Sequence, residues 1–279
     1  MDMMVDLYPS RQQPYPSIMP RRDPVVHGMA PPADGLLPET LERYRGDGFL
    51  FFDSFLARDM VEELSAEMDR LREETGSDDP RLIREPSSQT VRSIFEVHKQ
   101  SPLVDKLIRD PRLLGPVRQI LGGPVYVHQS RVNYKSGFEG GPFYWHSDFE
   151  TWHVEDGMPR MRAVSVQITL TENNSLNGPL MLIPGSHLHY VACAGETPDR
   201  ASLSALMKEG GIESPMGPPG SMILFDCNMI HGSNSNITPQ PCTDLFVVFN
   251  SVENRLAAPF GGTRPRPSYI AEREGEELA

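Results

Sequence analysis

The sequence has few cysteines and no long apolar run. Its three cysteines, Cys193, Cys227 and Cys242, do not show the spacing of a disulfide framework, so reduced thiols in the cytoplasm are expected. No segment reaches the roughly 18 apolar residues of a membrane helix. The N-terminal residues also lack the charged-then-apolar pattern of a secretory signal. The sequence therefore predicts a cytoplasmic protein with no membrane span.

Positive charge is also scarce. The formal net charge is -12, which argues against a nucleic-acid-binding surface because contacts to phosphates need clustered lysine and arginine. The chain of 279 residues is 38% hydrophobic, which is enough for one large domain with a sizeable core. No internal repeat is present.

Proline divides the chain into two unequal parts. Residues 1–35 are expected to form an extended, partly ordered arm, because proline prevents long helices and central strands. Residues 36–279 are expected to form a single domain. The prolines of the arm are Pro9, Pro14, Pro16, Pro20, Pro24, Pro31 and Pro32.

Hydrophobic periodicity changes along the domain. Helical spacing predicts helices over 37–44, 57–75 and 102–121, the last broken at Pro111. Short apolar or alternating runs predict strands over 49–52, 125–134, 162–170, 178–184, 221–225 and 244–249. Helices followed by many strands indicate an α+β domain built on an antiparallel barrel or double sheet. The long polar stretch 187–219 is expected to be a loop and a candidate lid.

One constellation of side chains points to chemistry. His146 and Asp148 form a His-x-Asp pair in an aromatic-rich run, and His231 lies far downstream. Residues i and i+2 of a strand face the same side, so the pair can point together into a barrel. Two imidazoles and one carboxylate are the facial triad of non-haem Fe(II) oxygenases. By composition alone the rival ligands are His128, His153, His187 and His189.

Longer stretches around these residues resemble the ectoine hydroxylases. That family belongs to the phytanoyl-CoA dioxygenase-like branch of the 2-oxoglutarate-dependent oxygenases. The matching stretches, which together span nearly the whole chain, are residues 6–11, 143–163, 177–187, 231–234 and 249–254.

The resemblance implies a fold, a reaction and a set of residues. The implied fold is a double-stranded β-helix (jelly-roll, cupin-like) core with surrounding helices, in a homodimer. The implied reaction uses Fe(II), 2-oxoglutarate and O2 to hydroxylate ectoine, a compatible solute, to 5-hydroxyectoine, and it releases succinate and CO2. The implied iron ligands are His146, Asp148 and His231. The residues expected around ectoine are Gln129, Thr151, Trp152, Ser165, Phe225 and Phe246.

The chain departs from the family pattern at the cosubstrate. Ser233 matches the family's hydroxyl partner of 2-oxoglutarate, but Cys242 stands where the family usually has an arginine that pairs with the distal carboxylate. Cysteine cannot form the planar two-point clamp of arginine. Asp244, in place of the usual asparagine, adds negative charge. Arg131 and Lys135 are the nearest alternative cations by sequence, and Asn133 between them is a further residue expected to bind the cosubstrate.

Several interpretations stay open from the sequence. Another cation could hold the cosubstrate, or binding could be weak, or activity could be lost, which would leave a metal-binding protein without turnover. The enzyme could also be an oxygenase of the same superfamily acting on another small zwitterion, such as proline. A zinc hydrolase is disfavoured, because no obvious general base accompanies the triad. Phe225 and Phe246 could equally be ordinary barrel core.

Overall fold

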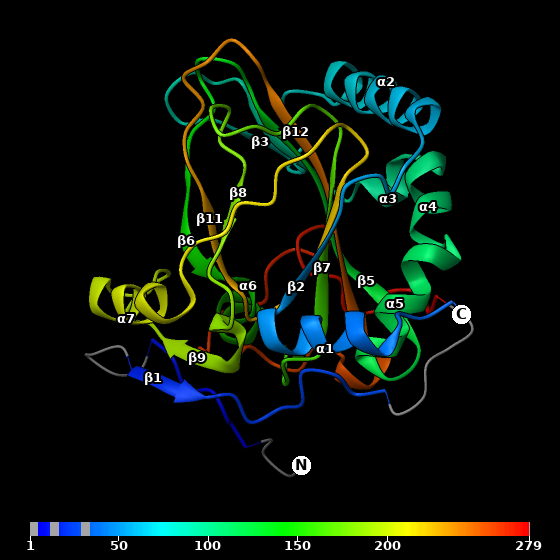
Figure 1. Ribbon diagram of the computed structural model, residues 1–279. Coiled ribbons are helices and arrows are strands. Elements are labelled where there is room, and N and C mark those ends of the chain that lie inside the picture. The colour runs from blue at the N-terminus through cyan, green and yellow to red at the C-terminus, as the bar shows by residue number, and fades with distance from the viewer. Residues whose placement is uncertain (1–4, 12–16, 29–33, 279) are drawn as a thin grey trace.

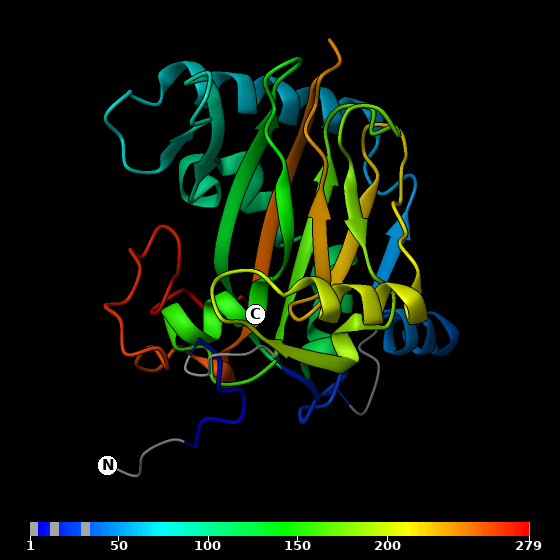
Figure 2. The ribbon, with the colours of Figure 1, turned by 90° about the vertical axis from the view of Figure 1, so that its left-hand side faces the viewer.

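Two antiparallel sheets lie opposite each other and form the centre of the protein (Figures 1 and 2). The computed structural model describes residues 5–11, 17–28 and 34–278. The larger sheet has the strand order β2-β10-β7-β12-β5-β4-β3, and the smaller has the order β6-β11-β8. A separate pair joins β1 to β9. This arrangement confirms the expected α+β jelly-roll fold.

The elements follow one another along the chain with short connections. The strands are β1 (Ser17–Pro20), β2 (Phe49–Phe52), β3 (Leu82–Arg84), β4 (Val91–Phe95), β5 (Val125–Lys135), β6 (Phe143–Ser147), β7 (Ala163–Thr169), β8 (Leu180–Leu182), β9 (His189–Ala192), β10 (Met222–Asp226), β11 (Ile230–Ser233) and β12 (Cys242–Ser251). The helices are α1 (Pro38–Asp47), α2 (Arg58–Glu74), α3 (Val97–Gln100), α4 (Pro102–Ile108), α5 (Pro111–Leu121), α6 (Asp148–Thr151) and α7 (Arg200–Gly210). Three short turns complete them: a π-helix η1 (Trp152–Asp156) and the 3-10 helices η2 (Ser186–Leu188) and η3 (Val252–Asn254).

The two faces of the large sheet differ in character. On β5, Val132 and Tyr134 pack into the main core, where they meet apolar residues of α2, α4 and α5. These helices cover that outer face (Figure 1). The alternate residues Arg131, Asn133 and Lys135 line a pocket on the inner face. The alternation of the strand thus separates a dry face from a polar face that looks toward the small sheet.

Local sequence explains why the helices start and stop where they do. Val61, Leu64, Met68 and Leu71 are the buried face of α2. The Ser101 hydroxyl accepts a hydrogen bond from the backbone of Val104 and so caps α4. Proline at the first turn of α5 separates it from α4, as predicted from Pro111. No helix in the described part of the chain is long and apolar enough to cross a membrane.

The prediction of a loop over 187–219 is wrong, because this stretch has regular secondary structure. This stretch contains η2, β9 and α7, and β9 pairs with β1 of the N-terminal arm. Leu206 of α7 packs with Ile183 and Ile230. The helix could not be predicted from the polar composition, because α7 is short and only one of its sides is buried.

The N-terminal arm packs against the domain over its described parts. Its β1 forms hydrogen bonds to β9, and Arg21 forms a buried ion pair of 2.8 Å with Asp226. Residues 1–4, 12–16 and 29–33 of the predicted arm lie outside the described residues. The division of the chain at residue 35 stays a prediction.

Gly48, at the junction of α1 and β2, generates a stability prediction. Its φ is +82°, and an added Cβ would lie 2.3 Å from His187 Nδ1 and 2.4 Å from Met229 Cε. Gly48→Ala should therefore lower the free energy of unfolding by about 2–3 kcal/mol, because of both the left-handed backbone and the clash. Gly46→Ala is the matched control. It lies in the same helix with open space around it, so it should stabilise by about 0.5–1 kcal/mol. Urea unfolding measures both, and equal effects would contradict the packing at Gly48.

Candidate metal centre and cosubstrate pocket

The pairing of β6 with β11 brings the two predicted histidines together. His146 and His231 are direct cross-strand partners in this antiparallel pair. Their rings lie 4.2 Å apart between centroids and are tilted by 52°. Side chains opposite each other on one face of a sheet are close neighbours. The register of the small sheet therefore places two imidazoles at one point.

Asp148 reaches the same point by a different route from the one predicted. The strand ends at Ser147, and Asp148 is the first residue of α6, so the same-face argument for a continuous strand is wrong. Ser147 caps this helix by accepting a hydrogen bond from the backbone N–H of Glu150. The turn from strand into helix directs the carboxylate back toward the histidines.

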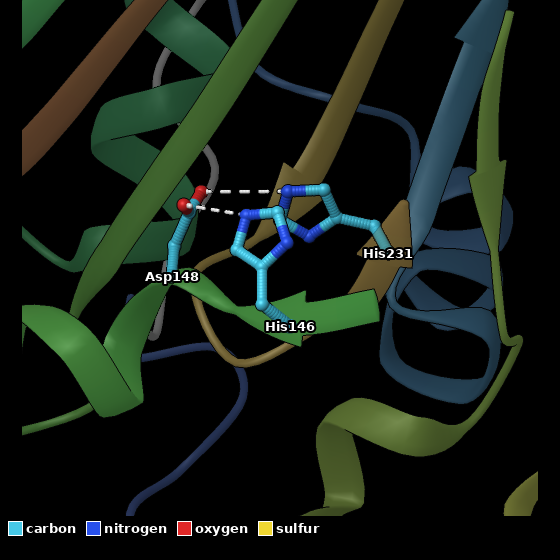
Figure 3. A group of neighbouring side chains, drawn as sticks. All are labelled: His146, Asp148 and His231. Carbon is cyan, nitrogen blue, oxygen red and sulfur yellow. Dashed lines mark ion pairs between the residues drawn. The ribbon is translucent and has the colours of Figure 1, made fainter. Parts of the chain in front are cut away.

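The three side chains converge on a common centre (Figure 3). Their ligand atoms all lie within 4.8 Å of one another. The carboxylate of Asp148 is 3.6 Å from His146 Nε2 and 3.9 Å from His231 Nε2. The Ser165 hydroxyl donates a hydrogen bond of 3.3 Å to the same carboxylate. This donor set fits the 2-His-1-carboxylate triad of Fe(II), which leaves further coordination positions open.

Backbone carbonyls fix which nitrogen of each histidine can bind a metal. His146 Nδ1 lies 2.7 Å from the Tyr144 carbonyl, and His231 Nδ1 lies 2.9 Å from the Met229 carbonyl. A carbonyl can only accept, so each Nδ1 carries the proton. Each Nε2 then presents a lone pair to the centre, which is the usual outer-shell arrangement of metal-binding histidines.

The electrostatics favour the ligand-competent protonation states. Burial, reinforced by the neighbouring His146, lowers the pKa of His231 to about 4. Burial alone would raise the pKa of Asp148, but His231, His146 and Arg131 outweigh it and hold that pKa below its usual range. At neutral pH the centre therefore holds a neutral His231 and an ionised Asp148.

The rival histidines occupy other places. His153 lies in η1 and bonds to Asp6 and to the Met158 carbonyl, and His187 lies in η2, the turn after β8. His128 and His189 are likewise absent from the one group of possible metal ligands among the described residues.

A pocket runs from the triad along the inner face of the large sheet. Lys135 of β5, Ser233 of β11 and Cys242 of β12 line one end of it, which is called the deep end below. Lys135 Nζ donates to the Ser233 hydroxyl at 2.6 Å, to the Gly178 carbonyl at 2.8 Å and to the Asn234 carbonyl at 2.6 Å. Of the two cations suggested by the sequence, Lys135 is the one that contacts Ser233.

Cys242 and Asp244 form a hydrogen-bonded group at this deep end. The Cys242 thiol donates to Asn173 Oδ1 at 3.1 Å and to the Asp244 carboxyl at 3.4 Å. Burial, with Asp244 beside it, raises the pKa of the thiol, and burial also raises the pKa of Asp244. Burial lowers the pKa of Lys135 to about 8. The end of the pocket is thus poor in positive charge.

Gln167 and Asn133 also line this pocket. Gln167 was not among the residues predicted from the sequence, although its place between Ser165 and Thr169 on β7 puts it on the inner face. Only the strand alternation could have suggested it. Asn133 accepts a hydrogen bond of 2.7 Å from the Ser93 hydroxyl.

The residues predicted around the substrate are divided between the pocket and its surroundings. Phe246 lines the pocket, and the Arg131 guanidinium lies 4.8 Å from the centre of its ring and bonds to Gln129. Phe225 meets the His231 ring edge-on at 5.1 Å. Trp152 is buried against His128, with the rings 5.0 Å apart. Gln129, Thr151, Trp152, Ser165 and Phe225 do not line this pocket.

Comparison with known proteins places this site in a family. The family model described as phytanoyl-CoA dioxygenase matches residues 44–242. The ectoine dioxygenase of Bordetella parapertussis is 48% identical and covers 96% of this chain and 93% of its own length. That of Halomonas elongata is 45% identical over 95% of this chain and 87% of its own. The chain belongs to the phytanoyl-CoA dioxygenase family and, within it, to the ectoine dioxygenases.

Solved structures agree with this membership. A crystal structure of EctD from S. alaskensis with 2-oxoglutarate and 5-hydroxyectoine is 48% identical, with a TM-score of 0.93 over 98% of this chain and 96% of that chain. The carbocyclase SnoK of nogalamycin biosynthesis, at 18% identity and a TM-score of 0.69 over 89% of this chain and 96% of that chain, shares the fold. The family resemblance inferred from the sequence is confirmed.

In this dioxygenase, Asp148 is the most direct test of the metal centre. Asp148→Asn keeps the shape but removes the charge, so the Fe(II) affinity should fall by at least the 10–100-fold that loss of an outer-shell partner costs. Asp105→Asn, which neutralises a partly exposed carboxylate of α4 paired with Arg109, is the control and should bind iron normally. Equilibrium dialysis with Fe(II) under anaerobic conditions measures both. Undiminished binding by Asp148→Asn would place the metal elsewhere.

Proposed function

We propose that this protein hydroxylates ectoine to 5-hydroxyectoine, with Fe(II), 2-oxoglutarate and O2 as cofactor and cosubstrates. The reaction balances as ectoine, 2-oxoglutarate and O2 giving 5-hydroxyectoine, succinate and CO2. The observation that supports it most is the convergence of His146, Asp148 and His231 at one centre, with the two histidines lining a pocket that also contains Lys135 and Ser233. The relatives named above are ectoine dioxygenases, and one was solved with 2-oxoglutarate and 5-hydroxyectoine.

Iron and the oxo acid would supply the oxidising chemistry, in which one atom of O2 enters a C–H bond and the other enters succinate. The protein's part is to hold the reactants and exclude water. His146, Asp148 and His231 would hold the metal on one side, so that its open positions face the pocket. Ser165, by its bond to Asp148, would keep the carboxylate oriented.

Lys135 and Ser233 would bind the distal carboxylate of 2-oxoglutarate. They lie at the deep end of the pocket whose other end holds the two histidines, and they already contact each other at 2.6 Å. The lysine supplies the positive charge that Cys242 cannot. Because all three lysine protons are engaged with oxygen atoms, the carboxylate would replace one of these contacts. We therefore expect weaker retention than a two-point arginine clamp gives.

Arg131 and Gln129 would face the substrate rather than the cosubstrate. Arg131 bonds to Gln129, lies over Phe246 and is close enough to Asp148 to influence its pKa. A buried cation at the metal end would attract the carboxylate of ectoine. The delocalised amidinium of ectoine would then lie toward aromatic faces. Phe225, which contacts His231, and Trp152, four residues after Asp148, are the candidates for these faces. Thr151 would offer a hydroxyl at the end of α6.

The function is tested by product formation. Ectoine incubated with the protein, Fe(II), 2-oxoglutarate and O2 should yield 5-hydroxyectoine and an equal amount of succinate, detected by mass spectrometry. Proline and other small zwitterions should give little of either product. Preferential turnover of one of these would favour a different substrate. Iron bound at the triad with no succinate formed would favour a metal-binding protein without turnover.

Restoring the missing cation should strengthen cosubstrate binding. Cys242→Arg is expected to lower the KM for 2-oxoglutarate by about tenfold, because a hydrogen bond to a charged group contributes roughly 1.5–3 kcal/mol. Lys135→Met should raise the same KM. The KM of the unchanged protein should also rise above pH 8, where Lys135 loses its charge among Cys242, Asp244, Arg92 and Glu85. Arginine stays charged, so Cys242→Arg should flatten this rise.

Two controls separate the clamp from general effects of charge and volume. Gln240→Arg adds the same charge at an exposed position of the same end and should leave the KM unchanged. Cys242→Ala removes the thiol without adding a cation and should not lower the KM. Steady-state kinetics at several pH values reads out all variants. An unchanged or raised KM in Cys242→Arg would show that the distal carboxylate is held by some other group.

The oligomeric state and the cellular compartment of the protein are also proposed. We propose a homodimer in the cytoplasm, on the basis of the family resemblance and of the cysteine usage. All three cysteines are free and buried in the structure, which is compatible with a reducing compartment.

A further inference from the structure

The helical segment that follows the metal site begins with Asp148 and continues through Trp152. It consists of α6 and the π-helix η1. π-Helical turns are rare and occur often at functional sites. The position of this segment therefore sets both a metal ligand and an aromatic side chain that the proposed function assigns to the substrate. What holds the segment in place bears on catalysis.

The N-terminal arm contacts this segment at Glu150 through hydrogen bonds and an ion pair. The Glu150 carboxylate is almost fully buried, with a relative exposure of 1%. The Ser10 hydroxyl donates to it at 2.6 Å, and Arg11 donates through Nε at 3.1 Å and through Nη2 at 2.8 Å. A further nitrogen of Arg11 reaches Glu155 at 2.6 Å. A single arginine of the arm thus joins the first and last turns of the segment.

Two more arm residues touch the same segment. His153 Nε2 lies 2.9 Å from Asp6 Oδ1, and Nδ1 of the same ring lies 2.8 Å from the Met158 carbonyl, so each ring nitrogen has an oxygen partner. Tyr8 meets Phe149 edge-on at 5.3 Å and is itself buried. These contacts alternate with Ser10 along the arm, so one extended face of residues 6–11 covers the helical segment.

The N-terminal arm is itself held in place by contacts with the rest of the domain. Arg11 N–H donates to the Cys193 carbonyl, β1 pairs with β9, and the buried Arg21–Asp226 pair lies further along. The C-terminal part of the chain supports the other side of the segment, where Phe260 stacks on His153 at 4.0 Å and Arg266 bonds to Asp156. The two ends of the chain thus pass beside α6 and η1 (Figure 2).

We propose that residues 6–11 are a positioning element of the active site, with Arg11 acting through Glu150 to orient the segment that presents Asp148 and Trp152. A buried carboxylate requires a charged, well-aligned partner. Arg11 provides this charged partner through two hydrogen bonds and so fixes the position of Glu150. Glu150 lies two residues after Asp148 and two residues before Trp152. The proposal uses the proposed function only to name ectoine as the substrate.

The geometry predicts a selective effect. The arm touches the segment with Asp148 and Trp152, whereas the deep end of the pocket is built from β5, β11 and β12. Loss of the arm contact should therefore affect ectoine and iron more than 2-oxoglutarate. A purely structural role would lower stability without this selectivity.

The test uses Arg11→Met in the full-length protein. The KM for ectoine should rise, and kcat fall, by about tenfold, a typical effect of losing an outer-shell contact, while the KM for 2-oxoglutarate stays nearly the same. Arg11→Lys, which keeps the charge but not the two-point geometry, should be intermediate. Glu150→Gln combined with Arg11→Met should be no worse than the more severe single variant, because the two residues act as one unit.

A spectroscopic readout makes the test independent of turnover. The chain has two tryptophans, Trp145 and Trp152, so Trp145→Phe leaves Trp152 as the reporter. In this background Arg11→Met should shift the Trp152 emission to longer wavelength and increase its quenching by acrylamide. Arg162→Met, which removes a partly buried arginine paired with Glu253 elsewhere, is the matched control and should do neither.

The outcomes separate this proposal from the proposed function. If Arg11→Met lowers the melting temperature as Arg162→Met does but leaves the Trp152 emission and the KM for ectoine unchanged, the arm is structural only and the proposal fails. If the unaltered protein does not turn over ectoine, the proposed function fails, and Trp152 emission with Fe(II) affinity still decides the role of the arm. Should Arg11→Met not fold, Ser10→Ala removes one bond to Glu150 and is read in the same way.

Discussion

The antiparallel pairing of β6 with β11 is the interaction on which the site depends. It sets His146 beside His231, and it ends at the point where the chain turns into α6 and presents Asp148. A shift of register by one residue would turn one imidazole to the other face of the sheet and abolish the triad. The carbonyls of the same strands fix the tautomers, so backbone geometry sets both the position and the chemistry of the ligands.

The pocket beside the triad shows a second constraint, which is a shortage of positive charge. Lys135 shares the deep end with a neutral thiol and with Asp244, whose pKa is raised by burial. Asp244 accepts hydrogen bonds from the Cys242 thiol and from the Asn173 amide. Cys242, Asn173 and Asp244 form a hydrogen-bonded group that supplies no positive charge. Lys135 is therefore the cation that would attract a carboxylate to this end of the pocket.

The alternation of the core strands could be predicted from the sequence because a two-residue period is a local pattern. The grouping of His146, Asp148 and His231 could be predicted from the His-x-Asp pair together with the family resemblance, although Asp148 lies at the start of α6 and not on a strand. Prediction from the sequence failed where long-range contacts decide. The helix α7 and the strand β9 were taken for a loop, since the pairing of β9 with an arm far away in the chain leaves no local signal. The sequence left Arg131 and Lys135 as alternative cations for the cosubstrate, because both side chains lie on the same face of β5 and only the fold shows that Lys135 contacts Ser233.

The same limit explains the role of the arm. Its prolines predicted extended backbone, which is seen in β1. Nothing in residues 6–11 alone shows that they contact Glu150, which lies more than a hundred residues away. The structure joins a terminal segment, a buried acid and a metal ligand into one unit. We therefore expect stability and catalysis to be coupled at the segment that follows β6.

A crystal structure of the protein with Fe(II) and 2-oxoglutarate would test the account most directly. The account predicts iron bound to His146, Asp148 and His231, with the distal carboxylate of 2-oxoglutarate in hydrogen-bond contact with Lys135 Nζ and the Ser233 hydroxyl. A distal carboxylate directed at Arg131, or bound without contact to Lys135, would contradict it.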